Sequence, residues 1–362
     1  MPFESGSFSF TVLELPQPLP EGLLELFADR AAGTVDSVTD ELQLGWVSGR
    51  HLLENTISEE TCFSGGAYML TLRKAIRKIQ PAYLNALCTR EGLVWKRANG
   101  RDFVPGKVRR EIKEEIMEKY LKNFIPSLAG IPMMLDPATG MLYVGAASNA
   151  QVEEFCAYFI ETTRIDPVRF SPNSILNKMG KAITDLPSLE LATGGFGEPV
   201  AGRDFLTWLW YFNETINRVE HPLFGAFAVA LDGPLVFAND SDCNGAAETV
   251  VRNGENPLRS AEAKAALVVG KKLKKAKLSL VRDEQVWSCT FDADNFNFSS
   301  FKPPEGEKLG AEEALTERVY STGIFKEGID LLFRTYADAM LGSEREALIA
   351  DMRKWAAERV GV

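Results

Sequence analysis

The chain has 362 residues, with 40 Lys and Arg against 50 Asp and Glu, which gives a formal net charge of -10. A hydrophobic fraction of 45% with 25% charged residues is ordinary for a globular protein and excludes a chain that is disordered throughout. No run approaches the ~20 apolar residues that cross a bilayer. The first ten residues lack the basic and apolar stretches of a signal peptide. We therefore expect a cytoplasmic protein without a membrane partner, built from two or three units of ordinary size.

In the first half of the chain, apolar periodicity predicts strands backed by helices. Two helices joined by the polar stretch Arg97–Asp102 form a helical hairpin that we expect to project from the α+β elements. Ser148 and Gln151 have the spacing of a capping box, so a helix should begin there. In chain order, the predicted elements are a strand at 6–14, a helix at 21–32, a strand at 66–72, helices at 81–96 and about 105–124, strands at 131–135 and 141–146, the helix after Ser148 and a strand at 166–170.

In the second half, Arg203–Asn213 is apolar nearly all round and predicts a buried helix. Asp232-Gly233-Pro234 predicts a hairpin turn between two short strands. The remaining expected elements are strands at 225–231, 234–238, 246–252, 273–282 and 285–293, and helices at 259–270, 311–341 and 343–359. The fold class is therefore α+β, with mixed or antiparallel sheets, the projecting hairpin, and a C-terminal α+β region that ends in two helices. The expected regions are 1–80 plus 125–184, the hairpin 81–124, a linker at 185–202, and 203–362.

The total charge hides a strong segregation along the chain. Residues 73–122 carry 14 basic and 6 acidic side chains, and residues 264–282 carry 7 basic and none acidic. Charge asymmetry of this kind indicates a polyanionic ligand. A basic run can also be a solvated face, and the mixed signs in the second hairpin helix fit that interpretation equally well. The five lysines between 271 and 277 have no acid nearby in sequence, so they repel one another unless a counter-charge arrives.

Motifs for catalysis or metal binding are absent from the sequence. Five cysteines stand at least 26 residues apart and two histidines lie far from each other, so neither a CxxC motif nor a zinc pattern forms. Asp292 and Asp294 are the one carboxylate pair that suggests a divalent metal, and no third carboxylate follows at motif spacing. We expect no catalysis, no cofactor and no metal.

The remaining signals concern binding to a phosphate backbone. No helix-turn-helix, zinc finger or RNA-binding strand motif is present, so we expect contacts with phosphates without base readout. The candidate DNA-binding residues lie at the start of the hairpin, around its connector, and on the lysine-rich strand: Arg73, Lys74, Arg77, Lys78, Lys96, Arg97, Arg101, Lys107, Arg109, Arg110, Lys271, Lys272, Lys274, Lys275 and Lys277.

At this point the sequence resembles the RdgC family of bacterial recombination-associated proteins. The resemblance covers about residues 6–170 and follows the order of the elements there. It is carried by Leu44-Gly45-Trp46-Val47, by Arg77-Lys78-Ile79-Gln80-Pro81 at a helix start, by the charged hairpin, and by Pro132–Asp136 followed by Gly140–Val144 and Ala147-Ser148. The match is looser in the C-terminal part, with Phe205–Trp210 and the lysine-rich strand.

The resemblance implies a ring-shaped homodimer whose central hole takes double-stranded DNA without sequence specificity. It also implies a nucleoid-associated protein that restrains RecA-driven recombination. The family's ring closes at a hydrophobic gate at the tip of a helical projection. By position, Phe124, Ile125 and Leu128 fall at that gate, although Pro126 departs from the family pattern. A ring that is acidic outside and basic inside would let a protein of net charge -10 bind DNA.

Two other functions compete with this one. A metal-dependent nuclease or other phosphodiester-processing enzyme would use Asp292 and Asp294 together with the basic residues. A protein-interaction scaffold would use the basic patches to meet an acidic partner or its own acidic face.

Overall fold

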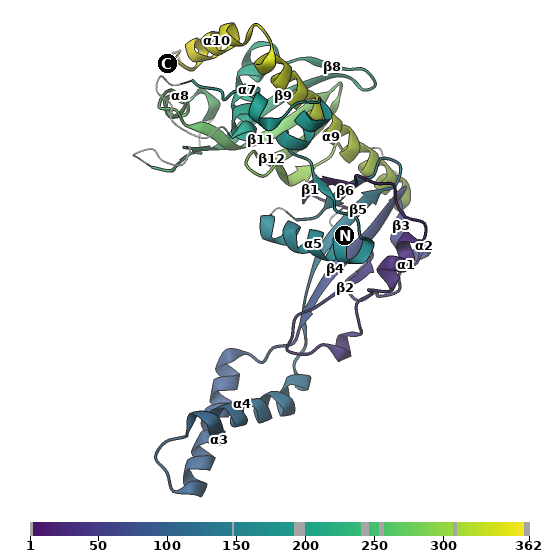
Figure 1. The fold of residues 1–362 in the computed structure, drawn as a ribbon, viewed down its shortest axis with the longest axis vertical. Helices are drawn as coiled ribbons and strands as arrows, with labels where there is room; N and C mark the ends of the chain where they lie inside the picture. Colours follow the sequence, from purple (N-terminus) through teal and green to yellow (C-terminus); the bar gives the residue numbers. More distant parts are fainter. Residues whose placement is uncertain are drawn as a thin grey trace. The chain divides into compact units, whose positions relative to one another are not determined.

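The structure is a computed structural model, and it describes residues 3–146, 148–191, 200–239, 246–252, 257–306 and 310–357. Helices and a largely antiparallel set of strands confirm the predicted α+β class. The chain divides into two compact units (Figure 1). Unit 1 comprises residues 1–20, 63–68 and 133–362, and unit 2 comprises residues 21–62 and 69–132.

Unit 1 is built on antiparallel strands in the order β10-β9-β11-β12-β13-β1-β6, with the end of β5 beside β6. The N-terminal strand thus pairs with β13 from the other end of the chain. The strands are β1 (Phe8–Glu14), β3 (Phe63–Ser64), β6 (Met141–Val144), β7 (Val168–Arg169), β8 (Val219–His221), β9 (Gly225–Ala238), β10 (Glu248–Val251), β11 (Lys272–Arg282), β12 (Gln285–Asp292) and β13 (Asn297–Lys302).

Helices of unit 1 bury its apolar side chains against these strands. Phe10 of β1, Phe298 and Phe301 of β13, and Phe325 of the long helix α9 form one aromatic cluster with ring centroids 4.8–6.5 Å apart. The helices are α5 (Asn149–Thr163), α6 (Pro172–Lys178), α7 (Ala201–Thr215), α8 (Ala261–Val268), α9 (Ala311–Leu341) and α10 (Arg345–Ala357), with short 3-10 turns at Ile183–Asp185 and Pro257–Arg259. Ser148 caps α5 through the amide of Gln151, as its spacing predicts.

The predicted hairpin at Asp232-Gly233-Pro234 is wrong. The segment is one continuous strand, β9, which pairs with β11 along its length. The register between the two strands shifts near Lys275 and Lys277, so the Gly-Pro pair is absorbed as an irregularity within the strand. Bulges are the positions at which a sheet tolerates proline. Pairing with β11 therefore outweighs the local preference of this segment for a turn.

Unit 2 combines a small sheet with the helical hairpin. It comprises α1 (Leu23–Ala28), β2 (Gln43–Ser48), α2 (Glu59–Cys62), most of β4 (Ala67–Ile76), α3 (Pro81–Asn99), α4 (Gly106–Tyr120) and the start of β5 (Ser127–Asp136), with 3-10 turns at Val35–Ser37 and Leu121–Asn123. Gly45 of β2 is required because a Cβ there would lie 2.5 Å from Cα of Ala32. The neighbouring Trp46 packs edge-on against Phe27 at 4.8 Å.

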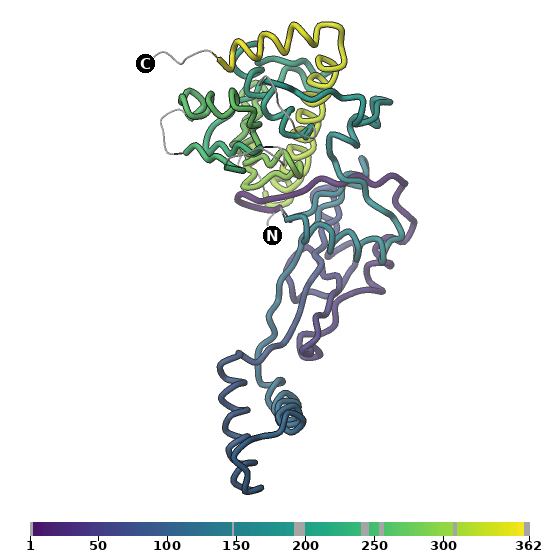
Figure 2. Tube along the Cα trace, turned by 60° about the vertical axis from the view of Figure 1, so that its left-hand side comes forward, coloured from purple at the N-terminus to yellow at the C-terminus, as the bar shows by residue number. Residues whose placement is uncertain are grey.

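The hairpin is a separate packing element of unit 2. Leu87, Val104, Ile112 and Ile116 are buried between α3 and α4 and form the apolar core of the hairpin. The chain enters α3 from β4 and leaves α4 toward β5, so both connections lie at the base of the hairpin (Figure 2). The connector, residues 100–105, lies at its tip.

The two units divide the chain differently from the regions expected from sequence. Strands β1 and β6 and helix α5 belong with the C-terminal residues, because β1 pairs with β13. Residues 192–199 of the expected linker at 185–202, together with Ala147 and Cys243, lie outside the described residues.

Candidate nucleic-acid interface

The two arginines of β4 are structural. Arg73 is 3% exposed and its guanidinium donates to the carbonyl oxygens of Leu52 and Gly33. Arg77 is also buried and donates to the carbonyl oxygens of Lys122, at 2.9 Å, and Val35, at 3.0 Å. Both guanidinium groups therefore tie loops of unit 2 together. Burial removes them from the phosphate-contacting surface expected from sequence.

The neighbouring lysines differ from these arginines in exposure. Lys74 is half-buried and Lys78 is exposed. The strand alternates sides, so successive residues of β4 point to opposite faces. Lys78 follows the end of β4 at Ile76, and its exposure leaves it available to a phosphate.

Two lysines at the start of the lysine-rich segment are also buried. Lys271 donates to the carbonyl oxygen of Ala246 at 2.8 Å and to the hydroxyl of Thr249 at 2.6 Å. Lys272 Nζ lies 2.7 Å from a carboxylate oxygen of Asp204 and 2.8 Å from the hydroxyl of Ser188. A charged side chain that is buried away from water needs hydrogen-bond or ion-pair partners of this kind. The expectation that these two lysines contact DNA is therefore corrected.

The remaining three lysines of β11 meet carboxylates from neighbouring strands. Lys274 binds Glu248 of β10 at 2.5 Å, and this contact raises the pKa of Lys274 and lowers that of Glu248. Lys275 lies 2.7 Å from Asp292, and Lys277 lies 3.8 Å from Asp232. Lys277 is exposed, as the alternating pattern predicts. The missing counter-charge is thus supplied within the fold, and the repulsion expected from sequence does not arise.

The carboxylates considered for a metal-dependent enzyme are engaged by cations. Asp292 faces Lys275, and Asp294 accepts from the guanidinium of Arg203 at 2.5 and 2.8 Å. Among the described residues, no group of three or more His, Cys, Asp or Glu side chains could hold a metal ion. Nothing in this geometry favours the nuclease alternative.

The basic residues of the hairpin remain open to solvent. We use the name connector segment for residues 96–110, which carry six basic residues and one acidic residue, Asp102. Lys96 is half-buried. Lys107 makes a long contact of 3.8 Å with Glu111. The exposed cations are Arg97, Arg101, Lys107, Arg109 and Arg110.

The charges of helix α4 alternate in sign along its exposed surface. Lys107 and Glu111 are four residues apart, and Arg110 and Glu114 have the same spacing, so each pair lies on one side of the helix. Arg109 and Lys113 are also four residues apart, and both are exposed. Lys113 is an exposed cation of the hairpin that is not among the residues predicted from sequence.

The residues expected at a dimer gate lie at the base of the hairpin and not at its tip. Phe124 packs on Tyr83, in the first turn of α3, with ring centroids 5.8 Å apart. Ile125 is 92% exposed and Leu128 is half-buried in β5. The exposed apolar residue at the tip is Phe103, in the connector. The position expected for the gate is therefore corrected.

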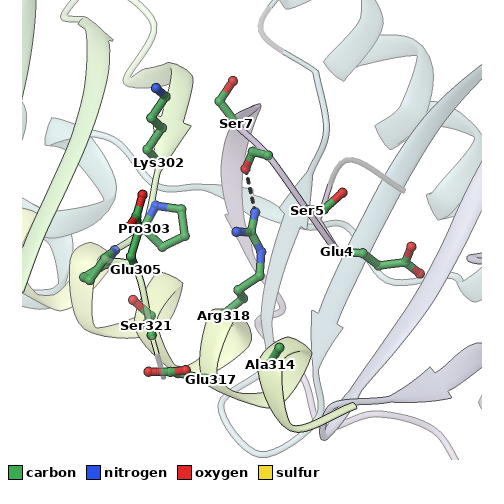
Figure 3. Close-up of a pocket in the computed structure, with 13 residues that line it drawn as sticks. Glu4, Ser5, Ser7, Lys302, Pro303, Glu305, Ala314, Glu317, Arg318 and Ser321 are labelled. Carbon is green, nitrogen blue, oxygen red and sulfur yellow. Dashed lines mark hydrogen bonds between the residues drawn. The ribbon is translucent and has the colours of Figure 1, made fainter. Parts of the chain in front are cut away.

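A hollow lies in unit 1, between the N-terminal segment, residues 302–306 and α9 (Figure 3). Its volume is about 490 Å³. Arg318 of α9 reaches across and donates to the carbonyl oxygens of Phe3 and Gly6, at 2.8 and 2.9 Å. Its lining mixes Lys302 and Arg318 with three glutamates, and holds no histidine or cysteine. The mixed charge does not favour a polyanion.

No protein-family model matches the chain, and no curated protein matches it either. Within the described residues, no helix is both long and apolar enough to cross a membrane.

Proposed function

We propose that this protein binds double-stranded DNA without sequence specificity, and that the hairpin is the element that contacts the phosphates. The observation that carries this proposal is the charge of the connector segment, which holds five exposed cations, the half-buried Lys96 and only one acidic residue, Asp102. Phosphates of the DNA backbone attract such a cluster and release counterions when they bind it. A protein of net charge -10 binds in this way because its acidic side chains lie elsewhere.

The remainder of the proposal rests on the resemblance to the RdgC family. By that resemblance the chain acts as a ring-shaped homodimer in the nucleoid and restrains RecA-dependent recombination. The lysine-rich segment 271–277 has a smaller part than the sequence suggests, since four of its five lysines lie within 3 Å of an acceptor in the fold.

Fluorescence anisotropy with two unrelated labelled duplexes tests the DNA-binding proposal. We expect equal affinity for both sequences, and a logarithm of the binding constant that falls linearly with the logarithm of the salt concentration. Each phosphate contact contributes a slope of about -0.9 for B-DNA. No binding at low salt, or binding that salt does not change, would disprove the proposal. Light scattering of the free protein tests the homodimer separately.

A further inference from the structure

A cavity of about 290 Å³ lies at the surface of the hairpin, between α3 and α4, and Leu93 of its lining is 51% exposed. Leu93 of α3, Val104 of the connector and Ile112 of α4 supply its apolar walls. This volume is near the lower end of the usual range for ligand pockets, which is roughly 300–1,000 Å³. The space therefore suits one small molecule better than a cofactor.

Gly92 keeps this cavity open. It is buried in the middle of the 19-residue helix α3 and lines the cavity. Glycine weakens a helix interior relative to alanine. A Cβ at this position would lie 3.5 Å from Cγ2 of Val104, which is ordinary contact, so the packing does not demand glycine. The consequence of glycine here is open space beside Val104.

Two cations line the same cavity without a counter-charge. Lys96 and Arg109 are the charged residues of its lining, and no carboxylate takes part. Neither side chain makes an ion pair or a hydrogen bond with any residue that the structure describes. Arg109 lies in the first turn of α4, which contains no acidic residue, so the helix dipole adds to the positive potential. Apolar walls beside two unpaired cations suit an anion that carries an apolar group.

We propose that this cavity binds a small organic anion. Its apolar group would lie between Leu93, Val104 and Ile112, and its carboxylate or phosphate would bind Lys96 and Arg109. The fork of a guanidinium matches two oxygens of either head group, and the ammonium adds a point charge. A neutral alcohol of the same size lacks the charge, and inorganic phosphate lacks the apolar group. Both are therefore weak ligands in this proposal.

A bound anion would also reduce DNA binding, since it occupies two cations of the connector segment; this consequence alone rests on the proposed function. Binding of the anion itself is measured without DNA. A protein that binds the anion but not DNA contradicts the proposed function and leaves the cavity proposal standing. A protein that binds DNA but no anion contradicts the cavity proposal alone.

Isothermal titration calorimetry of the full chain tests the proposal with four probes. Octanoate and phenyl phosphate represent the two head groups, and octanol and inorganic phosphate are the controls. We expect octanoate, phenyl phosphate or both to bind at least tenfold more tightly than either control. The head group that binds more tightly shows whether the site is built for a carboxylate or for a phosphate. The proposal would be overturned if octanol bound as tightly as octanoate. It would also be overturned if inorganic phosphate bound as tightly as phenyl phosphate and octanoate did not bind.

Variants then place the ligand. The double variant Lys96→Gln and Arg109→Gln should lose at least tenfold in affinity, because both charge-assisted contacts are removed. Arg97→Gln and Arg110→Gln form the matched control: each is the next residue in sequence and neither lines the cavity. This control should bind within about twofold of the wild type, and a loss equal to that of the first pair would overturn the proposal.

Gly92 variants test the cavity independently of charge. Gly92→Leu should abolish binding by filling the space. Gly92→Ala raises helix propensity and makes only ordinary contacts, so the protein should fold at least as well as the wild type and bind more weakly. Unchanged affinity in a folded Gly92→Leu protein would overturn the proposal, as would unchanged affinity in Gly92→Ala if the leucine variant does not fold.

Discussion

Lys275 and Asp292 are direct register partners across the β11–β12 pair, and Lys275 Nζ lies 2.7 Å from the carboxylate. Lys277 likewise approaches its register partner on β9, Asp232, and Lys274 meets Glu248 of β10, the strand beyond β9. Cross-strand pairs of opposite charge stabilise a sheet modestly. The charge of the lysine run is therefore largely neutralised by carboxylates of the same chain, without an external anion.

The buried pair Lys272–Asp204 should be important for stability. Replacing Lys272 with Met removes a cation that lies 2.7 Å from Asp204, which is 1% exposed. We expect the free energy of unfolding to fall by about 3–5 kcal/mol, the usual cost of removing one partner of a buried ion pair. Urea unfolding measures this change. Lys277→Met is the matched control, since its exposed contact at 3.8 Å should contribute less than about 1 kcal/mol. Equal effects of the two variants would contradict the prediction.

Arg77 should stabilise unit 2 without contributing to DNA affinity. Arg77→Met leaves the carbonyl oxygens of Val35 and Lys122 without their donor, at a cost of about 1–3 kcal/mol for each that stays buried. Thermal unfolding should show this loss, while the DNA affinity of the folded fraction stays unchanged. Lys78→Met, one residue further along, should leave the melting temperature unchanged. If the Arg77→Met protein were as stable as the wild type but bound DNA more weakly, Arg77 would contact DNA and the prediction would be wrong.

The hairpin should determine the salt dependence of DNA binding more than β11 does. Replacing Arg97, Arg101 and Arg110 with Gln should weaken binding to all sequences equally and reduce the salt slope by up to about 0.9 for each lost phosphate contact. Replacing Lys274, Lys275 and Lys277 with Gln removes the same charge from β11, where carboxylates already face the lysines. Anisotropy titrations at several salt concentrations compare the two. A larger loss in the β11 variant would show that this strand carries the contact.

Cys156 should lower the stability of the fold at alkaline pH. Burial raises the pKa of its thiol from about 9 to about 11. Below pH 9 the thiol is neutral in the folded and unfolded chain, so it has no effect on pH dependence there. Between pH 9 and 11 the unfolded chain loses this proton and the folded chain keeps it, so stability falls as pH rises.

The Cys156→Ala variant isolates this effect. Its melting temperature should fall less steeply than that of the wild type between pH 9 and 11. Cys289 and Tyr143, whose pKa values are also raised by burial, are present in both proteins and cancel in the comparison. Parallel curves for the two proteins would rule out Cys156 as the source.

Local pattern was sufficient to predict much of the fold. Helix α9 occupies 311–341 as expected, and strands β11 and β12 lie within two residues of the bounds expected for them. The continuous strand β9 was not predicted, because Asp232-Gly233-Pro234 has the composition of a turn. Pairing of β9 with β11 outweighs that local preference. Strand β13 was also missed, although Phe298 and Phe301 reach the core from it. Alternation there is interrupted by two adjacent serines.

The charge of -10, its segregation, and the apolar stripe that joins α3 to α4 are determined by the sequence alone, because they depend on composition and on neighbours within a few turns. Which cations remain free is decided by the tertiary structure. Arg77 is buried on carbonyl oxygens and Lys275 meets Asp292, whereas Arg97 stays in solvent. The physical reason is that a charge is neutralised by whatever lies within a few ångströms. In β11 those partners come from strands 17 to 45 residues away in sequence.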